Sequence, residues 1–169
     1  MASDIETVLT ALNQANVRYL VVGGVAVVLH GHLRTTADLD LIIQLETDNT
    51  LRAVDALAQL GYQPRAPVPI EQFADASMRQ SWLTEKGMTV LGLWSENFPT
   101  LEVDLFIAEP IDFNTAYNRA LTVTLDSTTA TVVSLDDLIS LKRMAARAID
   151  LADIEAMQAL KEVNENSNE

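Results

Sequence analysis

The sequence predicts an α/β or α+β fold in which a small mixed β-sheet is flanked by helices, with a helical extension at the C-terminal end. Three observations support this prediction. Helical and strand-like apolar patterns alternate early in the chain, several short strand-like segments follow, and a long helical pattern comes last. With 169 residues, 49% of them hydrophobic, the chain can bury one sizeable core. We therefore expect a single domain over residues 1–163, with a helical region over 135–163.

The first part of the chain alternates helices and strands. Apolar residues recur at helical spacing after Ser3, from Ile5 to Leu12, and Gly31 and Gly61 lie where two further helices end. The expected elements are a helix from Ser3 or Asp4 to about Asn16, a strand over 18–22, a turn at Gly23-Gly24, a short helix over 25–30, a strand over 39–45 and a helix over 50–60.

The second part contains shorter segments. Residues 62–69 include three prolines, which predict an irregular connection. The expected elements beyond it are a hairpin with strands over 80–84 and 88–94, a strand over 101–107, a helix over 113–120, two short strands over 121–125 and 130–134, and a helical region from 135 to about 163. The polar tail over 164–169 is expected to be disordered.

The composition limits the classes of function. A formal net charge of −13 leaves few basic side chains to replace the counterions of DNA, so general nucleic-acid binding is not expected. The acidity indicates either simple solubility, a cationic small substrate or a basic protein partner. The chain has no cysteine, no leader-like N-terminus and no apolar run of membrane-spanning length, so we expect a cytoplasmic protein without a membrane segment.

Two acidic residues interrupt the apolar segment "ADLDLII". Because alternate side chains of a strand point to the same face, Asp38 and Asp40 project together, while Leu39 and Leu41 face the core. Adjacent carboxylates repel each other unless a divalent cation binds them, and Mg²⁺ suits a site that keeps room for water and phosphate. Taken alone, a single D-x-D pair is more typical of the solvent-exposed face of an edge strand.

A third acidic residue lies in the segment "TLEVDLFIA". Asp104 stands between two core-type residues, and on a neighbouring strand it would complete a site for two metal ions about 3.5–4 Å apart. Glu102 points to the same side of the strand and is the alternative, but it lies nearer the start of the strand. Either residue also fits an exposed face. We expect Asp104 to be the third acid.

Two glycines connect the first strand to the short helix. Glycine allows close approach of the backbone to a ligand, and a helix N-terminus presents free N–H groups that suit phosphate. Gly23 and Gly24 match neither a P-loop nor a dinucleotide-binding motif. A lone glycine pair is most often a turn, but glycines, a short helix and then "RTTADLD" form a much more specific combination.

This combination resembles the nucleotidyltransferase superfamily, which has the DNA polymerase β-like fold. The segment "GGVAVVLHGHLRTTADLDL" is similar to small bacterial nucleotidyltransferases related to abortive-infection toxins, and "SLDDLISLKRMAARAIDLADI" is similar to their C-terminal helices. The resemblance extends from about Tyr19 to Leu160, almost the whole chain. Many members have a serine after the first glycine, whereas Gly24 and Val25 follow here, so backbone N–H groups would serve alone.

The resemblance implies a role for each matching residue. Gly23 and Gly24 would hold the triphosphate, and Asp38 and Asp40 would bind two Mg²⁺ ions. Asp104 would bind the catalytic ion and help to deprotonate the attacking hydroxyl. That hydroxyl would attack the α-phosphorus in line, and pyrophosphate would leave.

Three further residues are candidates for nucleotide binding. Arg34 and Thr35 precede the acids, where Arg34 could reach a phosphate and the threonine could brace the loop; the alternative is a capped turn in which Arg34 pairs with an acid. The resemblance favours Lys142 as a phosphate contact, whereas ordinary salt bridging of this region with Asp150 is the default. His30 and His32 are expected at a helix end and in a loop rather than as ligands.

Aromatic residues offer a further candidate contact, with a nucleobase. Trp82, Trp94 and Tyr62 could stack on a base, but core packing is the expected role of the tryptophans.

The sequence leaves two classes of function open. The first is a magnesium-dependent enzyme that moves NMP from an NTP to a hydroxyl of an RNA or tRNA end, a protein side chain or a small molecule. A toxin with a basic antitoxin partner, or an aminoglycoside-type antibiotic nucleotidyltransferase, would each be a form of this enzyme. The second is a catalytically silent binding or regulatory module with the same fold.

Overall fold

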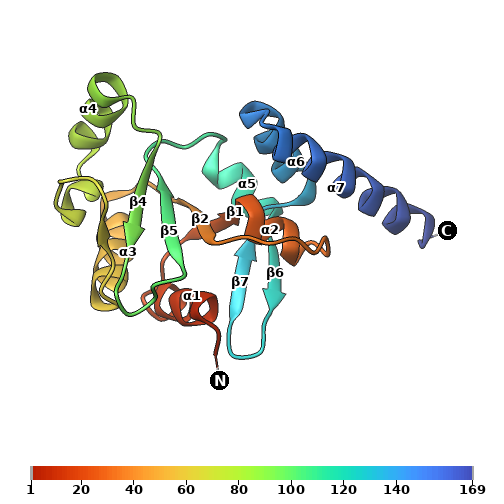
Figure 1. Cartoon of the computed structure of the whole chain (residues 1–169), viewed down its shortest axis with the longest axis horizontal. Helices are drawn as coiled ribbons and strands as arrows, with labels where there is room; N and C mark the ends of the chain where they lie inside the picture. The colour runs from red at the N-terminus through yellow and green to blue at the C-terminus, as the bar shows by residue number, and fades with distance from the viewer. Residues whose placement is uncertain (1, 169) are drawn as a thin grey trace.

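The computed structural model describes residues 2–168, which form a mixed sheet with helices around it (Figure 1). The strands are β1 (Tyr19–Val22), β2 (Asp38–Ile43), β3 (Gln63–Pro64), β4 (Val90–Trp94), β5 (Glu102–Phe106), β6 (Leu121–Thr124) and β7 (Thr129–Val132). The helices are α1 (Asp4–Gln14), α2 (Gly23–Leu29), α3 (Thr47–Gln59), the 3₁₀ helix η1 (Ile70–Ala74), α4 (Ala76–Lys86), α5 (Phe113–Arg119), α6 (Leu135–Ala145) and α7 (Ala148–Asn166).

The strand order of the sheet is β3-β4-β5-β2-β1-β7-β6. β2 lies between β1, which runs antiparallel to it, and β5, which runs parallel to it. The sheet is therefore mixed, and its central strands come from distant parts of the chain. This arrangement confirms the predicted fold class.

The apolar pattern of the sequence explains the central strands. All four residues of β1 are buried, as its uninterrupted apolar run predicts. In β2, Leu39 and Leu41 are fully buried while Asp38 and Asp40 are partly exposed. Burying each leucine contributes roughly 1.5–3 kcal/mol, so the leucines determine which face of β2 carries the aspartates.

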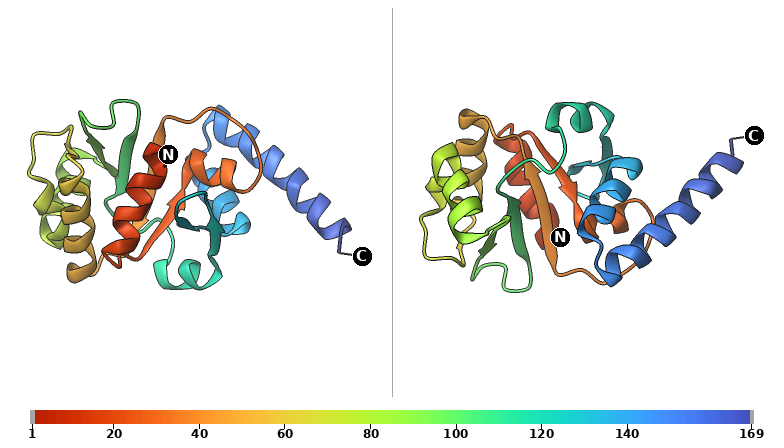
Figure 2. Two further views of the ribbon diagram at one scale, coloured as in Figure 1. Left: turned by 90° about the horizontal axis from the view of Figure 1, so that it is seen from below. Right: turned by 90° about the horizontal axis from the view of Figure 1, so that it is seen from above.

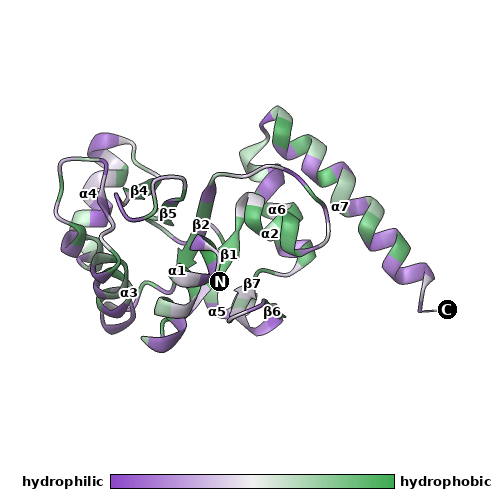
Figure 3. Ribbon diagram, turned by 60° about the horizontal axis from the view of Figure 1, so that its bottom comes forward, coloured by the Kyte–Doolittle hydropathy of each residue, from purple (hydrophilic) through white to green (hydrophobic). Residues whose placement is uncertain are grey.

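The helices are placed at both ends and on the faces of the sheet. Figure 2 shows α3 and α4 at the end opposite α6 and α7, with the C-terminal part of α7 extending away from the rest of the molecule. α2 contacts β1, β2 and α6, which brings the start of α2 close to the aspartates of β2. β1 is largely hydrophobic and β2 has hydrophilic residues at its start, whereas hydrophilic and hydrophobic residues alternate along α7 (Figure 3).

The hairpin predicted over residues 80–94 is wrong in its first half. Residues 76–86 form the helix α4, and only 90–94 form a strand. Asp75 caps α4 because its side chain accepts hydrogen bonds from the backbone N–H groups of Ser77 and Met78. Gly87, at φ 62°, ends α4 in the left-handed conformation that glycine adopts readily. Cap residues at both ends thus select a helix in a segment with little amphipathic pattern.

Two smaller corrections concern the glycine turn and the C-terminal tail. Gly23 and Gly24 do not form a separate turn; they are the first residues of α2. The helical region predicted over 135–163 is present as two helices, because the helix is interrupted at Ala146, which has φ 51°. The tail expected to be disordered from residue 164 instead continues α7 to Asn166, since the helical hydrogen bonds extend through polar residues; Glu169 lies outside the described residues.

Across residues 2–168, none of the helices combines the length and the apolarity that crossing a lipid bilayer requires.

Candidate active site

The three predicted acids lie on two neighbouring strands. β2 and β5 run parallel, and their register places Asp40 opposite Asp104 and Asp38 opposite Glu102. Alternation along each strand directs all four side chains to one face of the sheet. The structure therefore brings together Asp38, Asp40 and Asp104, the residues that sequence reasoning selected.

The structure also separates the two candidates for the third acid. Glu102 forms an ion pair with Arg65 and lines a separate pocket with Trp94 and Phe98. Asp104, by contrast, lines a cavity together with Asp40. Of these two acids, it is Asp104 that faces the same space as the D-x-D pair.

The carboxylates destabilise one another in the absence of a cation. Burial, followed by repulsion from Asp104 and Asp38, raises the pKa of Asp40 to about 7. Burial also raises the pKa of Asp104, with repulsion from Asp38 and Glu102 adding to it. A divalent cation between the carboxylates would remove this repulsion.

The donor set fits a hard divalent cation. The aspartates offer only carboxylate oxygens, which Mg²⁺ prefers. Within residues 2–168, no three His, Cys, Asp or Glu side chains converge closely enough to hold a metal ion by themselves. Partial coordination by protein is the usual arrangement for Mg²⁺, which takes its remaining ligands from water and from the phosphates of a substrate.

Gly23 and Gly24 allow the start of α2 to lie against the site. Gly23 has φ 66°, and a Cβ on this residue would overlap the carboxylate of Asp40. A Cβ on Gly24 would come within 2.7 Å of Arg34 Nη2 and of Thr36 Oγ1. The two glycines are therefore required for close packing of the backbone against the acids and against the loop over residues 34–36.

A group of five charged residues, which we call the charge network, lies beside the acids. Its members are Arg34, Lys142, Arg147, Asp150 and Asp153. Lys142 Nζ lies 3.1 Å from Asp150 Oδ1 and 3.1 Å from Asp153 Oδ2. Arg147 Nε lies 2.8 Å from Asp150 Oδ2, and Arg34 Nε lies 3.2 Å from Asp153 Oδ1. The salt bridging with Asp150 that the sequence suggests is therefore present.

Two adjoining cavities share the site. A cavity of about 290 Å³, the polar cavity, is lined by Gly23, Gly24, residues 34–37, Asp38, Asp40, Asp104, Lys142, Arg147 and Ile149. A second of about 330 Å³, the apolar cavity, shares five of these residues and adds Val22, Thr89, Val90, Phe106, Leu138, Leu141, Ala145 and Asp150. Acids and cations thus face each other across the polar cavity, whereas the apolar cavity extends toward α6.

The predicted nucleotide-binding residues all line the polar cavity, although not in the same way. Thr35 is exposed, and its carbonyl accepts a hydrogen bond from Arg34 Nη1. Lys142 lines the cavity but is only 4% exposed, and its ammonium group lies between two carboxylates. Arg147 lines both cavities but was not among the predicted site residues. Its position one turn after Arg143 and three residues before Asp150 was the available sequence signal.

The remaining candidates lie elsewhere. His30 lies at the C-terminal end of α2, as expected from the sequence. Its Nε2 atom is 2.8 Å from the carbonyl oxygen of Val133. Trp82 is buried in the core, and Tyr62 stacks on Phe98 and donates a hydrogen bond to the carbonyl of Leu101. These aromatic side chains do not line the polar or apolar cavity.

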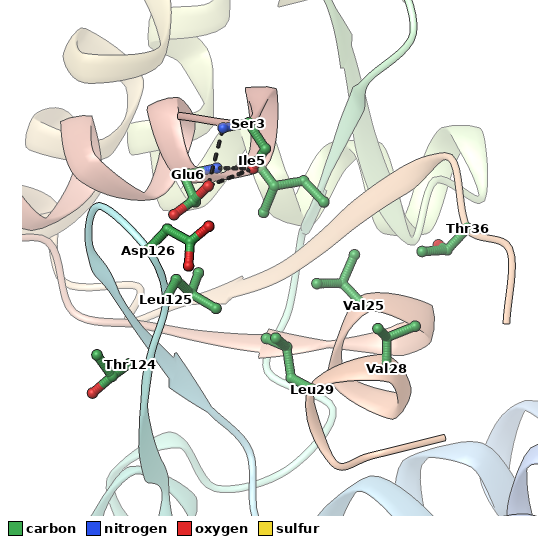
Figure 4. Close-up of a pocket in the computed structure, with 10 residues that line it drawn as sticks. All are labelled: Ser3, Ile5, Glu6, Val25, Val28, Leu29, Thr36, Thr124, Leu125 and Asp126. Atoms are coloured by element: carbon green, nitrogen blue, oxygen red, sulfur yellow. Dashed lines mark hydrogen bonds between the residues drawn. The ribbon is translucent and has the colours of Figure 1, made fainter. Parts of the chain in front are cut away.

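A third cavity, of about 360 Å³, lies on another side of α2 (Figure 4). Val25, Val28 and Leu29 form its α2 wall, and Glu6 lies at its edge, where it accepts hydrogen bonds from Ser3. These hydrogen bonds, together with those from Ser127, lower the pKa of Glu6 to about 2. None of Asp38, Asp40 and Asp104 lines this cavity; these acids face the polar and apolar cavities instead.

Comparisons with known proteins add to this geometry. Residues 1–167 match the family described as "Nucleotidyltransferase of unknown function (DUF6036)". The fold is similar to the lincosamide antibiotic adenylyltransferase LnuA in its lincomycin-bound crystal structure, with TM-score 0.60, 15% identity, and 90% of this chain and 93% of that chain covered. It is also similar to an antigenic nucleotidyltransferase-like protein from Paracoccidioides brasiliensis, with TM-score 0.52, 15% identity, and coverage of 94% and 78%. No curated protein matched the sequence. At these identities the structural matches show the fold alone.

Proposed function

The chain belongs to the DUF6036 family of nucleotidyltransferases, and from this premise we propose that it transfers NMP from a magnesium-bound NTP to a hydroxyl group. Nucleotidyltransferases generally use divalent metal ions. We propose Asp38, Asp40 and Asp104 as the residues that would hold two Mg²⁺ ions. The register that sets Asp40 opposite Asp104 at the polar cavity is the observation that carries this proposal.

Several residues around the polar cavity would together position the NTP. The backbone at Gly23 and Gly24 approaches the triphosphate without steric hindrance, and Arg34 and Thr35 face it from the adjacent loop. Bound magnesium would neutralise charge that develops on the phosphates. Asp104 accepts the proton of the attacking hydroxyl, which forms a bond to the α-phosphorus as the bond to pyrophosphate breaks.

The apolar cavity favours a small-molecule hydroxyl as the acceptor. Val90, Phe106 and Leu141 line it next to Asp104. Of its two cations, Lys142 is held between Asp150 and Asp153, and Arg147 also lines the polar cavity, where the NTP phosphates would lie. Such walls suit an apolar body better than a phosphate backbone, which needs free cations. An antibiotic-like acceptor therefore fits this site better than an RNA end.

Parallel labelling tests donor and acceptor together. The protein is incubated with α-³²P-labelled NTPs, magnesium and separate cell fractions of RNA, protein and small molecules. We expect label in the small-molecule fraction, and its loss by at least about a hundredfold in Asp40→Asn and Asp104→Asn. Glu102→Gln is the matched control, because Glu102 carries the same charge on the same strand but pairs with Arg65.

Other outcomes decide between the remaining readings. Label in RNA or protein would contradict a small-molecule acceptor and favour the toxin reading, for which a basic antitoxin is the expected partner. Nucleotide binding that depends on magnesium, without transfer to any fraction, would favour a catalytically silent module. No binding of any NTP would contradict the proposed function.

A further inference from the structure

We propose that Asp150 and Asp153 are positioning residues that hold the guanidinium groups of Arg34 and Arg147 at the polar cavity, where they bind the phosphates of the NTP. Lys142 then acts as the buried link between the two aspartates rather than as a phosphate contact. The inference rests on the proposed function. It specifies which cations bind the phosphates and which residues hold those cations in place.

Lys142 is enclosed by negative charge. Its side chain is 5% exposed, and the two carboxylates that face it, Asp150 and Asp153, are 0% and 3% exposed. Binding phosphate through Lys142 would require breaking two contacts inside the protein, which would leave buried carboxylates uncompensated. The ammonium group therefore stays with the aspartates.

The two arginines are placed differently. Arg147 contacts Asp150 through Nε and, at 3.4 Å, through Nη2, while its side chain remains 71% exposed. Arg34 contacts Asp153 through Nε, and its Nη2 lies next to Gly24 at the start of α2. A guanidinium has five donors, so both arginines keep donors that are free for phosphate oxygens.

The Arg34 end of the charge network has unused hydrogen-bonding capacity. Arg34 Nε and Asp153 Oδ2 are buried and lie close to opposite charges, yet neither has a hydrogen bond of good geometry. We expect this end of the charge network to tighten when phosphate binds.

The alternative is that Asp150 and Asp153 have a purely structural role. The effect of a charge change on phosphate binding distinguishes this role from positioning of the arginines. The charge network has three cations and two anions, so Asp153→Asn raises its formal charge by one. If the aspartates only join α6, α7 and the loop, this extra positive charge should strengthen the binding of a polyanion. If they position the arginines, binding should weaken despite the more favourable charge.

The experiment measures binding of inorganic tripolyphosphate by calorimetry in magnesium-containing buffer. We expect Kd to rise about tenfold in Asp153→Asn and in Asp150→Asn, the loss that removing one charge-assisted contact produces. Asp136→Asn is the matched control, since Asp136 on α6 is 74% exposed, pairs with Lys161 and does not line the polar cavity. Its Kd should change less than twofold.

Folding is followed by thermal unfolding of each variant, and binding is measured well below the transition. Arg34→Lys keeps the charge at the loop and does not remove a buried carboxylate, so it serves if an asparagine variant does not fold. Its Kd should also rise, because lysine cannot contact Asp153 and phosphate with one planar group.

The outcomes separate the two proposals. Unchanged or tighter binding in the asparagine variants, or wild-type affinity in Arg34→Lys, would overturn the positioning role. If wild-type protein bound neither tripolyphosphate nor any NTP, the proposed function would fail as well.

Discussion

Asp40 on β2 and Asp104 on β5 are direct neighbours in the register of the two strands, although they are far apart in the sequence. Val22 is paired with Asp40 on the other side of β2, which places Gly23 directly beside the Asp40 carboxylate. Asp40 thus takes part in both the parallel β2–β5 pairing and the antiparallel β1–β2 pairing. Asp40 is the point where the acids and the glycine backbone come together.

Because the carboxylates repel one another, we expect the acidic site to lower the stability of the folded protein when no metal ion is bound. Asp40→Asn removes a partly buried carboxylate whose pKa is raised by burial and by Asp104 and Asp38. We expect the variant to unfold at a higher temperature than wild type in buffer with a metal chelator, measured by calorimetry, while losing activity. Magnesium should stabilise wild type and not the variant. A lower unfolding temperature in chelator would contradict this prediction.

Gly23→Ala tests the contact between α2 and Asp40. The φ of 66° costs a non-glycine residue about 1–2 kcal/mol, and the new Cβ would also overlap Asp40. Gly87→Ala is the matched control, because Gly87 has φ 62° and open space around its Cβ position. In urea unfolding we expect both variants to lose stability, Gly23→Ala by more. Transfer activity should be lost only in Gly23→Ala, and equal losses of stability would argue against the overlap.

Local patterns predicted the elements that build the site. The alternation of Leu39 and Leu41 with Asp38 and Asp40 was sufficient to place the acids on one face of β2, because burial of the leucines dominates that choice. The register between β2 and β5 was not predictable, since it depends on the helices and strands that separate them in the chain. Glu102 and Asp104 are two residues apart on the same strand, so alternation alone did not distinguish between them.

The caps of α4 explain why the segment expected to be a hairpin is a helix. The hairpin expected at 80–94 left out Asp75 and placed Gly87 in its turn, whereas these two residues cap α4 at its ends. The break between α6 and α7 has no such signal, because Ala146 adopts φ 51° without a glycine. There the cluster of Lys142, Arg147 and Asp150 stabilises the corner, and a nonlocal ion network cannot be identified from helix propensity.

The charge network should also make stability depend on pH in acid. Burial would raise the pKa of Asp150, but hydrogen bonds from Arg147 and Lys142 outweigh it and lower the pKa to about 2. Because the folded state holds the carboxylate ionised, the resulting stability is present above the unfolded pKa near 4 and is lost as pH falls toward 2. Urea unfolding between pH 5 and 2 should show a smaller fall in Asp150→Asn than in wild type. Asp136→Asn should follow wild type, and identical slopes in all three proteins would contradict the assignment.

The two halves of α7 should differ in how much they stabilise the protein. Met157 is fully buried, whereas the described residues beyond Lys161 are exposed (Figure 2). Met157→Ala should therefore lower the free energy of unfolding by about 2–5 kcal/mol, the range for a buried large-to-small change. Deleting residues 164–169 should change it by less than about 0.5 kcal/mol, because residues 164–168 are all exposed. A large effect of the deletion in urea unfolding would show that the exposed end of α7 packs against another surface in solution, such as a second copy of the chain.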